Sequence, residues 1–269
     1  MIDRKLVKAA KVQRYRDVEH AEAYKGRFRD GVGKVRDLIE QTFVRRHVDG
    51  WILDAGIGTG RFSVPLSWMG HPVVGVDASL PMLDAVRTEL GDKIDLVKCD
   101  VELLPFRSDK FDSIVCIRVI FHLPQYKEVL AEFLRVLKPG GRLMFDVLSH
   151  EHRQLARRMA KWLRVPIPSP STDPLDFHLS LEAKEIYQLV RNCGARCIEL
   201  RSYDCLSTYW VGKVPPLKRL VRLVLRLPWL AELWAKTEVS LGPLLSPYLT
   251  ARHFVVVEMP AFSSKQELG

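Results

Sequence analysis

Short apolar segments alternate with amphipathic ones through the middle of this chain. Segments rich in β-branched residues predict strands at 51–54, 72–77, 94–98, 111–117 and 142–147. Between them, apolar residues recur at helical spacing and predict helices at 62–69, 80–90 and 126–137. Strands that alternate with helices favour a parallel sheet covered on both faces, in which ligands bind beyond the carboxyl ends of the strands.

The pattern changes after residue 150. A basic amphipathic helix is predicted at 150–165, and a second helix at 181–193, with Ser180 as its N-cap. Strands at 196–203 and 253–258 bring the predicted sheet to seven strands, mostly parallel. The residues before position 50 predict one or two further helices.

The segment LDAGIGTG (53–60) joins the first strand to the first helix. Its glycines, Gly56, Gly58 and Gly60, occupy alternate positions. Glycine suits a backbone with positive φ or the close approach of a ligand, and the N–H groups at a helix start suit a polar or anionic group. The spacing differs from the GxGxxG dinucleotide fingerprint. Taken alone, the loop is also consistent with a tight strand–helix turn.

Two carboxylates follow the next strands. Asp77 ends the second strand, where its two oxygens can accept hydrogen bonds from both hydroxyls of a ribose. Asp100 ends the third strand, where a carboxylate can accept from an exocyclic amine. Ligand-type positions therefore occur at three successive strand ends, and this coincidence is stronger than any one motif.

These segments resemble class I S-adenosylmethionine-dependent methyltransferases, in the group that includes the ubiquinone and menaquinone biosynthesis enzymes. The matching sequences are LDAGIGTGRF (53–62), VVGVDASLPML (73–83), CDVELLPF (99–106), FDSIVCIRVIFHL (111–123) and LRVLKPGGRL (134–143). The resemblance implies a doubly wound, Rossmann-like α/β fold. It also implies S-adenosylmethionine as cofactor, with S-adenosylhomocysteine as product.

The same resemblance assigns a cofactor site. Around the methionine part it places the first motif, Asp54, Ala55, Gly56, Gly58 and Gly60. Around the adenosine it places Asp77 on the ribose, Ala78 and Met82 beside it, and Asp100 and Val101 at the adenine. Ile117 and Arg118 are expected at the methionine end.

Catalysis by methyl transfer depends mainly on proximity and alignment, and a base is needed only if the acceptor must lose a proton. His122 follows the fourth strand, where a neutral imidazole can act as that base; the alternative is a structural histidine that caps the next helix. Many relatives carry a His-His pair here, whereas this chain has Phe121 before His122. Arg118 is expected to orient an acidic substrate or the cofactor carboxylate.

The resemblance suggests one methyltransferase domain over residues 1–269, with a cofactor-binding core at 51–150. Residues 1–50 would form a helical lid, in which Tyr15 and Tyr24 close over the site. Phe121 is also expected near the substrate. Ordinary packing is the alternative for both tyrosines. Helical insertions at 151–180 and 204–250 would cap the substrate.

The net charge of +9 suggests a polyanionic partner. The distribution of the charge along the chain limits such a partner to certain segments. Residues 51–150 carry 11 basic and 13 acidic side chains, so the excess lies outside the core. In the insertions, at 150–165 and 213–236, basic residues share one helical face and Leu, Val and Trp fill the others, which is typical of helices at a membrane interface.

We therefore expect a small, apolar or amphipathic acceptor, such as a lipid or quinone, and peripheral membrane contact through the insertions. An RNA (tRNA or rRNA) methyltransferase is an alternative, although no RNA-binding module is recognisable and the insertions lack interleaved aromatic platforms. A non-catalytic cofactor-binding protein is a second alternative.

The five cysteines show no CxxC and no Cys/His cluster with metal-ligand spacing, so reduced thiols and no metal are predicted. The charged N-terminus lacks the apolar core of a secretory signal, and no apolar run approaches the roughly 20 residues of a spanning helix. These features predict a cytoplasmic protein that can lie against the inner face of a membrane.

Overall fold

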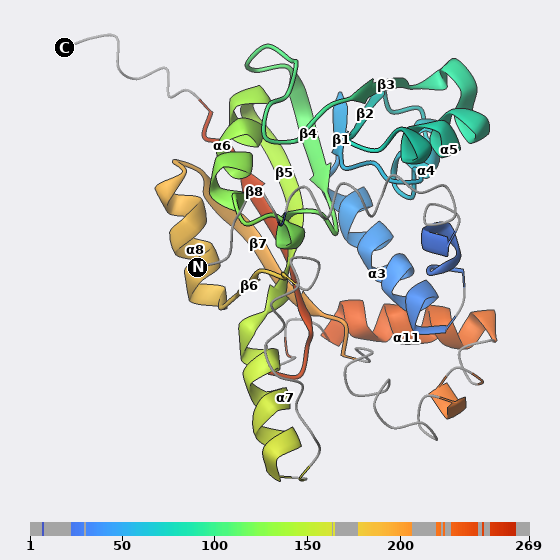
Figure 1. The fold of residues 1–269 in the computed structure, drawn as a ribbon, viewed down its shortest axis with the longest axis vertical. Helices are drawn as coiled ribbons and strands as arrows, with labels where there is room; N and C mark the ends of the chain where they lie inside the picture. The colour runs from blue at the N-terminus through green and yellow to red at the C-terminus, as the bar shows by residue number, and fades with distance from the viewer. Residues whose placement is uncertain are drawn as a thin grey trace.

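A single central sheet with helices on both faces organises the molecule (Figure 1). The computed structural model describes residues 7, 23–29, 31–162, 164, 177–205, 219–221, 223, 227–241, 244 and 248–261. Its strands are β1 Ile52–Ala55, β2 Val73–Asp77, β3 Asp95–Lys98, β4 Phe111–Cys116, β5 Leu137–Ser149, β6 Ser180–Leu181, β7 Arg196–Tyr203 and β8 Arg252–Glu258. Its helices include α3 Gly31–His47, α4 Ser63–Trp68, α5 Leu80–Leu90, α6 Tyr126–Val136, α7 His150–Trp162, α8 Ala183–Asn192 and α11 Pro228–Leu241, with short 3-10 turns η1 Gly91–Lys93 and η2 Ile120–His122.

The strand order β3-β2-β1-β4-β5-β8-β7 confirms the doubly wound fold. The chain moves outward from β1 through β2 to β3 and then returns to the other side of β1 as β4 and β5, all parallel. β8 runs antiparallel between β5 and β7. The strand order reverses between β1 and β4, and their carboxyl ends therefore border the crevice where such sheets bind ligands.

Each face of the sheet has its own apolar layer, because successive residues of a strand point to opposite faces. Phe145 of β5 packs in the layer that contains α6 and α8, and its neighbour Met144 packs in the layer that contains α3, α5 and α11. Figure 1 shows α6 and α8 on one side of the sheet and α3, α4 and α11 on the other. Helices cover both faces of the sheet and exclude water from them, which accounts for the near-continuous apolar runs of β4 and β5.

The largest departures from the sequence prediction concern β5 and β6. β5 begins at Leu137, directly after α6, because Leu137 pairs with Phe111 before a register shift in the ladder. Ser180 is not a helix N-cap: it lies in β6, a strand the sequence pattern does not predict, and it pairs with Leu148. The following helix instead begins after Glu182, whose side chain takes part in a capping box with Glu185.

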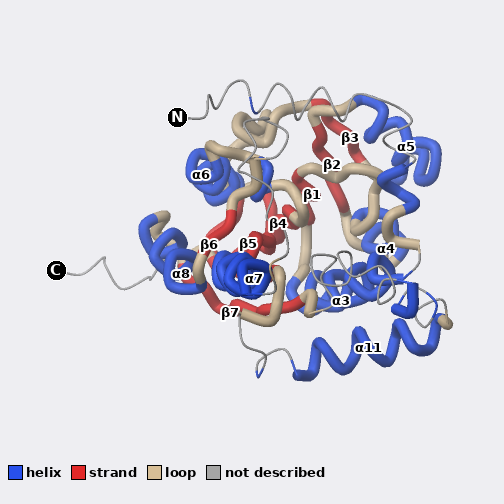
Figure 2. The backbone as a smooth tube through the Cα atoms, turned by 60° about the horizontal axis from the view of Figure 1, so that its bottom comes forward, coloured by secondary structure: helices blue, strands red, loops and turns tan. Residues whose placement is uncertain are grey.

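Helices from the N-terminal and C-terminal parts of the chain pack in the core beside the sheet. α3 buries Ile39 and Phe43 against the sheet, and α11 buries Ala231 and Ala235 in the same layer. Figure 2 shows α11 alongside α3. α7 extends from the end of β5 away from the body of the molecule (Figure 1). Within the described part of the chain, no helix combines the length and the apolar character needed to cross a bilayer.

Candidate active site

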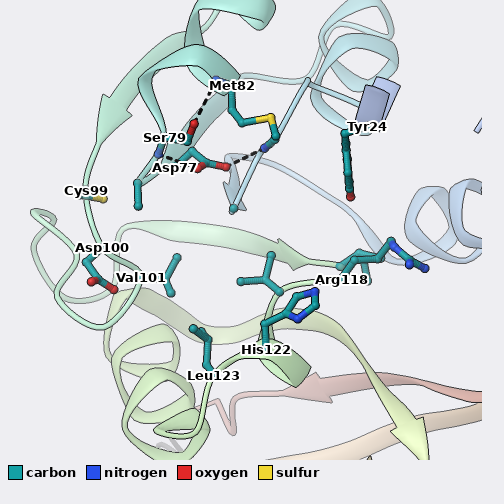
Figure 3. A pocket seen from close by; sticks show the side chains of 15 residues that line it. Tyr24, Asp77, Ser79, Met82, Cys99, Asp100, Val101, Arg118, His122 and Leu123 are labelled. Atoms are coloured by element: carbon teal, nitrogen blue, oxygen red, sulfur yellow. Dashed lines mark hydrogen bonds between the residues drawn. The ribbon is translucent and has the colours of Figure 1, made fainter. Parts of the chain in front are cut away.

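A pocket lies beyond the carboxyl ends of β1 to β4, at the reversal of strand order (Figure 3). Each of these strands ends in a loop that supplies part of the lining. The lining residues are Tyr24, Gly56, Gly58, Asp77, Ala78, Ser79, Met82, Cys99, Asp100, Val101, Ile117, Arg118, Val119, His122 and Leu123. The pocket therefore collects residues from four successive loops and one N-terminal segment.

The glycine loop after β1 leaves room for a ligand. Gly56 has φ +78°, and a Cβ at this position would lie 2.4 Å from Cγ2 of Val119 in the loop after β4. Gly58 has φ +54°, and a Cβ at this position would make only ordinary contacts, with Cε1 of Tyr24 at 3.7 Å and the carbonyl oxygen of Gly56 at 4.0 Å. The first glycine thus allows two loops to approach each other, and the second keeps the pocket open beside its own backbone.

Asp77 is tied to this loop through both carboxylate oxygens. Oδ2 accepts from the N–H of Gly58 at 3.0 Å, and Oδ1 accepts from the N–H of Ser79 at 2.9 Å. Burial raises the pKa of Asp77, and these backbone donors oppose the rise. Each carboxylate oxygen has two lone pairs, so the fixed carboxylate keeps acceptor capacity for hydroxyl groups of a ligand.

The two ends of the pocket differ in charge. Asp77 and Asp100 lie at one end in Figure 3, with Arg118 at the other and Tyr24 entering from the side opposite His122. The Nη1 atom of Arg118 is buried without a hydrogen bond in the described part of the chain, and Oε1 of its ion-pair partner Glu40 is 3.7 Å away. The arrangement suits a ligand with hydroxyl or amine groups at one end and an anionic group at the other.

Two fully buried carboxylates, Glu40 of α3 and Asp146 of β5, hold the Arg118 loop in place. Oδ1 of Asp146 accepts from the backbone N–H of Arg118 at 2.5 Å, and Oδ2 lies 2.5 Å from Nη1 of Arg252. Tyr203 donates its hydroxyl to Oε1 of Glu40 at 2.8 Å. Arg118 itself has φ +68°, a costly conformation for a residue with a side chain, so these contacts fix a strained turn.

Arginine neighbours keep Glu40 ionised despite its burial. Burial alone would raise the pKa of Glu40, but the surrounding guanidinium groups outweigh it and hold the pKa at about 2. The strongest of them is Arg61, whose Nη2 lies 2.6 Å from Oε2 of Glu40, followed by Arg118. The ring centroids of Phe28 and Phe62 each lie 4.2 Å from the central carbon of the Arg61 guanidinium. The segment 23–29 therefore packs against the same arginine that pairs with Glu40.

The structure brings most of the predicted site residues together, and a few lie elsewhere. Asp54 lies beneath the pocket, where its carboxylate accepts from Oγ of Ser63 at 2.6 Å and burial raises its pKa to about 6. Ala55 is buried in the core, Gly60 packs against Val64, and Phe121 lies behind His122 with 3% of its surface exposed. Tyr15 lies outside the described residues.

Sequence reasoning misses four lining residues: Ser79, Cys99, Val119 and Leu123. Ser79 could have been found, because it is the N-cap of α5 and accepts from the N–H of Met82 at 3.4 Å. Val119 and Leu123 lie in the irregular loop around η2, where no periodic pattern indicates which side chains face a ligand.

The expected cap segments contribute no side chain to this lining within their described parts. The closest approach is made by residues 177–179, which precede β6. The ring of His178 lies 5.1 Å from that of His122 and stacks on Phe121 at 5.9 Å, centroid to centroid. A second imidazole therefore stands beside His122, contributed by a distant part of the chain.

Comparison with known proteins agrees with this geometry. A family model described as a methyltransferase domain matches residues 53–145, which run from β1 into β5. Residues 53–145 are therefore similar to a methyltransferase domain. Domains of this class take S-adenosylmethionine as methyl donor, and the pocket fits it: Asp77 and Asp100 suit an adenosine, and the buried Nη1 of Arg118 suits a carboxylate.

Relatives of the methyltransferase domain include quinone enzymes. The chain is 38% identical over 99 residues to a demethylmenaquinone methyltransferase of Renibacterium salmoninarum, covering 37% of this chain and 41% of the relative. It is 27% identical over 166 residues to a ubiquinone biosynthesis O-methyltransferase of Cereibacter sphaeroides, covering 59% and 66%. The chain thus spans less than half of the first relative and about two thirds of the second.

The fold of the methyltransferase domain and its additions also has solved counterparts. The magnesium protoporphyrin IX methyltransferase of Synechocystis, solved with bound S-adenosylhomocysteine, aligns with a TM-score of 0.59 at 13% identity, over 93% of this chain and 99% of that one. The likeness at this identity concerns the fold.

Substituting Gly56 tests whether the glycine loop serves the ligand. Gly56→Ala and Gly70→Ala each place a side chain on a positive φ, but only Gly56→Ala meets a neighbour; nothing lies within 4 Å of a Cβ at Gly70. Gly70→Ala should lose about 1–2 kcal/mol of unfolding free energy in urea titrations because of its positive φ, and Gly56→Ala should lose more because of the clash with Val119. Only Gly56→Ala should also weaken S-adenosylhomocysteine binding, by about tenfold or more in calorimetry.

The double variant Gly56→Ala/Val119→Ala removes the clashing methyl groups and should restore part of that affinity. Equal affinities for the Gly56→Ala and Gly70→Ala variants would show that the close approach of these two loops does not matter for binding.

Proposed function

We propose that this protein is an S-adenosylmethionine-dependent methyltransferase that acts on a small, apolar or amphipathic acceptor of the quinone or lipid type. The proposal rests on one observation. Within the matched residues, one pocket at the reversal of strand order has the carboxylates of Asp77 and Asp100 at one end and Arg118 and His122 at the other. S-adenosylmethionine supplies a methyl group on a sulfonium, so the leaving group needs no further activation.

The residues of the chain then contribute binding and alignment. Asp77, fixed by the N–H groups of Gly58 and Ser79, holds the ribose hydroxyls, and Met82 and Val101 flank the base. Arg118, on its strained turn, orients the carboxylate end. Alignment of this kind can supply roughly 7–11 kcal/mol of the barrier reduction in a displacement reaction.

An apolar acceptor is supported by the apolar part of the pocket lining. Ile117, Val119 and Leu123 line the pocket beside His122, and the ring of Tyr24 enters it from the N-terminal segment. The printed names of the relatives point the same way, since two of them act in menaquinone and ubiquinone biosynthesis.

His122 is the general base in this proposal. It lines the same pocket as Arg118, and a neutral imidazole can accept a proton whereas the Arg118 guanidinium cannot. A neutral imidazole there takes the proton of an acceptor hydroxyl or carbon acid as the new bond to the methyl carbon forms.

Replacing His122 should therefore separate chemistry from binding. His122→Ala should lower turnover by at least about 100-fold and leave S-adenosylhomocysteine affinity within about twofold, measured by a methyl-transfer assay and calorimetry. Unchanged turnover would show that His122 is not the base.

The acceptor class can be tested directly. Purified protein is incubated with S-[methyl-³H]adenosylmethionine and, separately, with lipid, small-metabolite and RNA extracts. Label is expected in the organic-soluble lipid and quinone fraction. Label confined to RNA would replace this proposal with an RNA methyltransferase, and label in no fraction would remove the enzymatic proposal.

We also propose that α7 brings the enzyme to an anionic membrane surface. Its outer half exposes Arg157, Arg158 and Lys161, and Trp162 at its end has 79% of its surface exposed. Basic side chains beside an exposed tryptophan favour the interface of an anionic leaflet. Such contact would deliver a lipid-like acceptor from the inner face of a membrane; the segment 213–236 can contribute through the exposed Trp229 and Leu233 of α11.

Co-sedimentation with vesicles tests this contact. The protein should bind phosphatidylglycerol-containing vesicles and not neutral phosphatidylcholine vesicles. Arg157→Ala/Arg158→Ala should weaken binding by at least about tenfold, because each basic residue near such a surface is worth about 1 kcal/mol. The matched control is Arg45→Ala/Arg46→Ala, an exposed pair in the last turn of α3. Equal losses from both pairs would contradict a specific role for α7.

A further inference from the structure

The segment before β6 is fixed against η2 by its backbone. The N–H of Leu179 donates to the carbonyl of Phe121 at 2.8 Å, and Ser180 continues into the β5 ladder opposite Leu148. Arg153 of α7 donates from Nη1 to the carbonyl of His178 at 3.2 Å. These hydrogen bonds place His178 beside Phe121 and His122, whatever contacts its own side chain makes.

The side chain of His178 joins an aromatic cluster with the proposed base. Its ring stacks on Phe121, with 5.9 Å between centroids and 21° between planes, and lies 5.1 Å from the ring of His122 at 57°. The ring centroids of His122 and Phe121 are 4.2 Å apart. His122 lines the pocket, whereas His178 stands behind it.

The charged groups around this pair are mostly cationic. Arg252 of β8 lies 4.8 Å from the Phe121 ring, and Arg118 lies 6.0 Å from it. Asp146 of β5 is the nearby carboxylate, and it is engaged by Arg252 and by the N–H of Arg118. Among the described residues, further charged groups on the packed elements include Arg153 of α7 and the exposed Lys127 and Glu128 in the first turn of α6.

Two imidazoles whose ring centroids lie 5.1 Å apart interact electrostatically. A proton on one ring disfavours a proton on the other, and the neighbouring guanidinium groups add to the cost. Arg118 and His122 line the same pocket, whereas His178 is not part of the lining, so the charge of Arg118 disfavours a proton on His122 more than on His178.

We propose that His178 is a positioning residue of this site that takes the first proton of the pair and so keeps His122 neutral and ready to act as a base. The proposal rests on the function given above. In the step it serves, the acceptor O–H bond breaks and its proton passes to a ring nitrogen of His122. The oxygen electron pair forms the bond to the methyl carbon, and the electrons of the broken C–S bond remain on sulfur.

A titration by NMR tests this without an acceptor. The Cε1–H signals of the histidines are followed against pH in the full-length protein, and His122 is assigned from the spectrum of His122→Asn. In the wild type, His178 should bind its proton before His122 as the pH falls. In His178→Phe, which keeps a ring against Phe121, the pKa of His122 should rise by at least about 0.5 unit.

His71→Phe is the matched control and should leave the titration of His122 unchanged, because its imidazole lies outside the pocket. If His178→Phe does not fold, His178→Asn carries the same expectation. An unchanged pKa of His122, or a His122 that takes the first proton, would overturn the proposal.

Activity provides a second readout. The acid limb of the kcat/KM profile should move to higher pH in His178→Phe, with kcat on the plateau within about threefold of the wild type. Adding His178→Phe to His122→Asn should cause no further loss, because His178 acts through His122. If no methyl transfer is found, the proposed function fails, and the NMR titration still decides the coupling of the two histidines.

Discussion

Burial of Glu40 and Asp146 is the constraint on which this architecture depends. Neither carboxylate reaches solvent, and a buried charge is tolerated only when it is paired and hydrogen-bonded. Arginines and a tyrosine from distant parts of the chain meet that requirement. The partners lie on β7, on β8, in the loop between β1 and α4, and in the loop after β4. Pairing these two carboxylates therefore joins α3 to one half of the sheet.

The same pairing shapes the candidate active site. The loop after β4 turns at Arg118 through a left-handed backbone conformation, and Asp146 holds that turn by accepting the Arg118 N–H. Arg118 thereby presents a buried cation at the end of the pocket opposite Asp77 and Asp100. Contacts in the core thus fix the positively charged end of the pocket. The fixed carboxylate of Asp77, at the end of β2, lies at the other end.

Local features of the sequence predict well which residues after β1, β2 and β3 line the pocket. Gly56, Gly58, Asp77 and Asp100 each follow a strand whose apolar pattern is clear, and parallel strands bring their carboxyl ends to one edge. Glycine spacing alone does not separate ligand contact from packing, which is why Gly60 lies against Val64 away from the pocket. The length of β5 depended on a register shift that no local pattern records.

The acceptor side was less predictable, because it depends on contacts between distant segments. Nothing near Glu40 in the sequence indicates that it faces Arg61, Arg118 and Tyr203. Likewise, His178 follows a Pro/Ser-rich stretch with no periodic signal, and only the bond from Leu179 to Phe121 brings it beside His122. The overall basic charge describes the segments outside the core and says little about the chemistry in the pocket.

The central claim, that this pocket binds S-adenosylmethionine through the strand-end carboxylates, is tested most directly by calorimetric titration with S-adenosylhomocysteine. The wild type should bind one equivalent, and Asp77→Asn should bind about tenfold or more weakly, since an amide replaces one acceptor oxygen with a donor. Asp84→Asn, an exposed residue of α5 paired only with Arg87 in the described structure, should bind as the wild type does. No binding by the folded wild type, or equal binding by the Asp77 variant, would contradict the account.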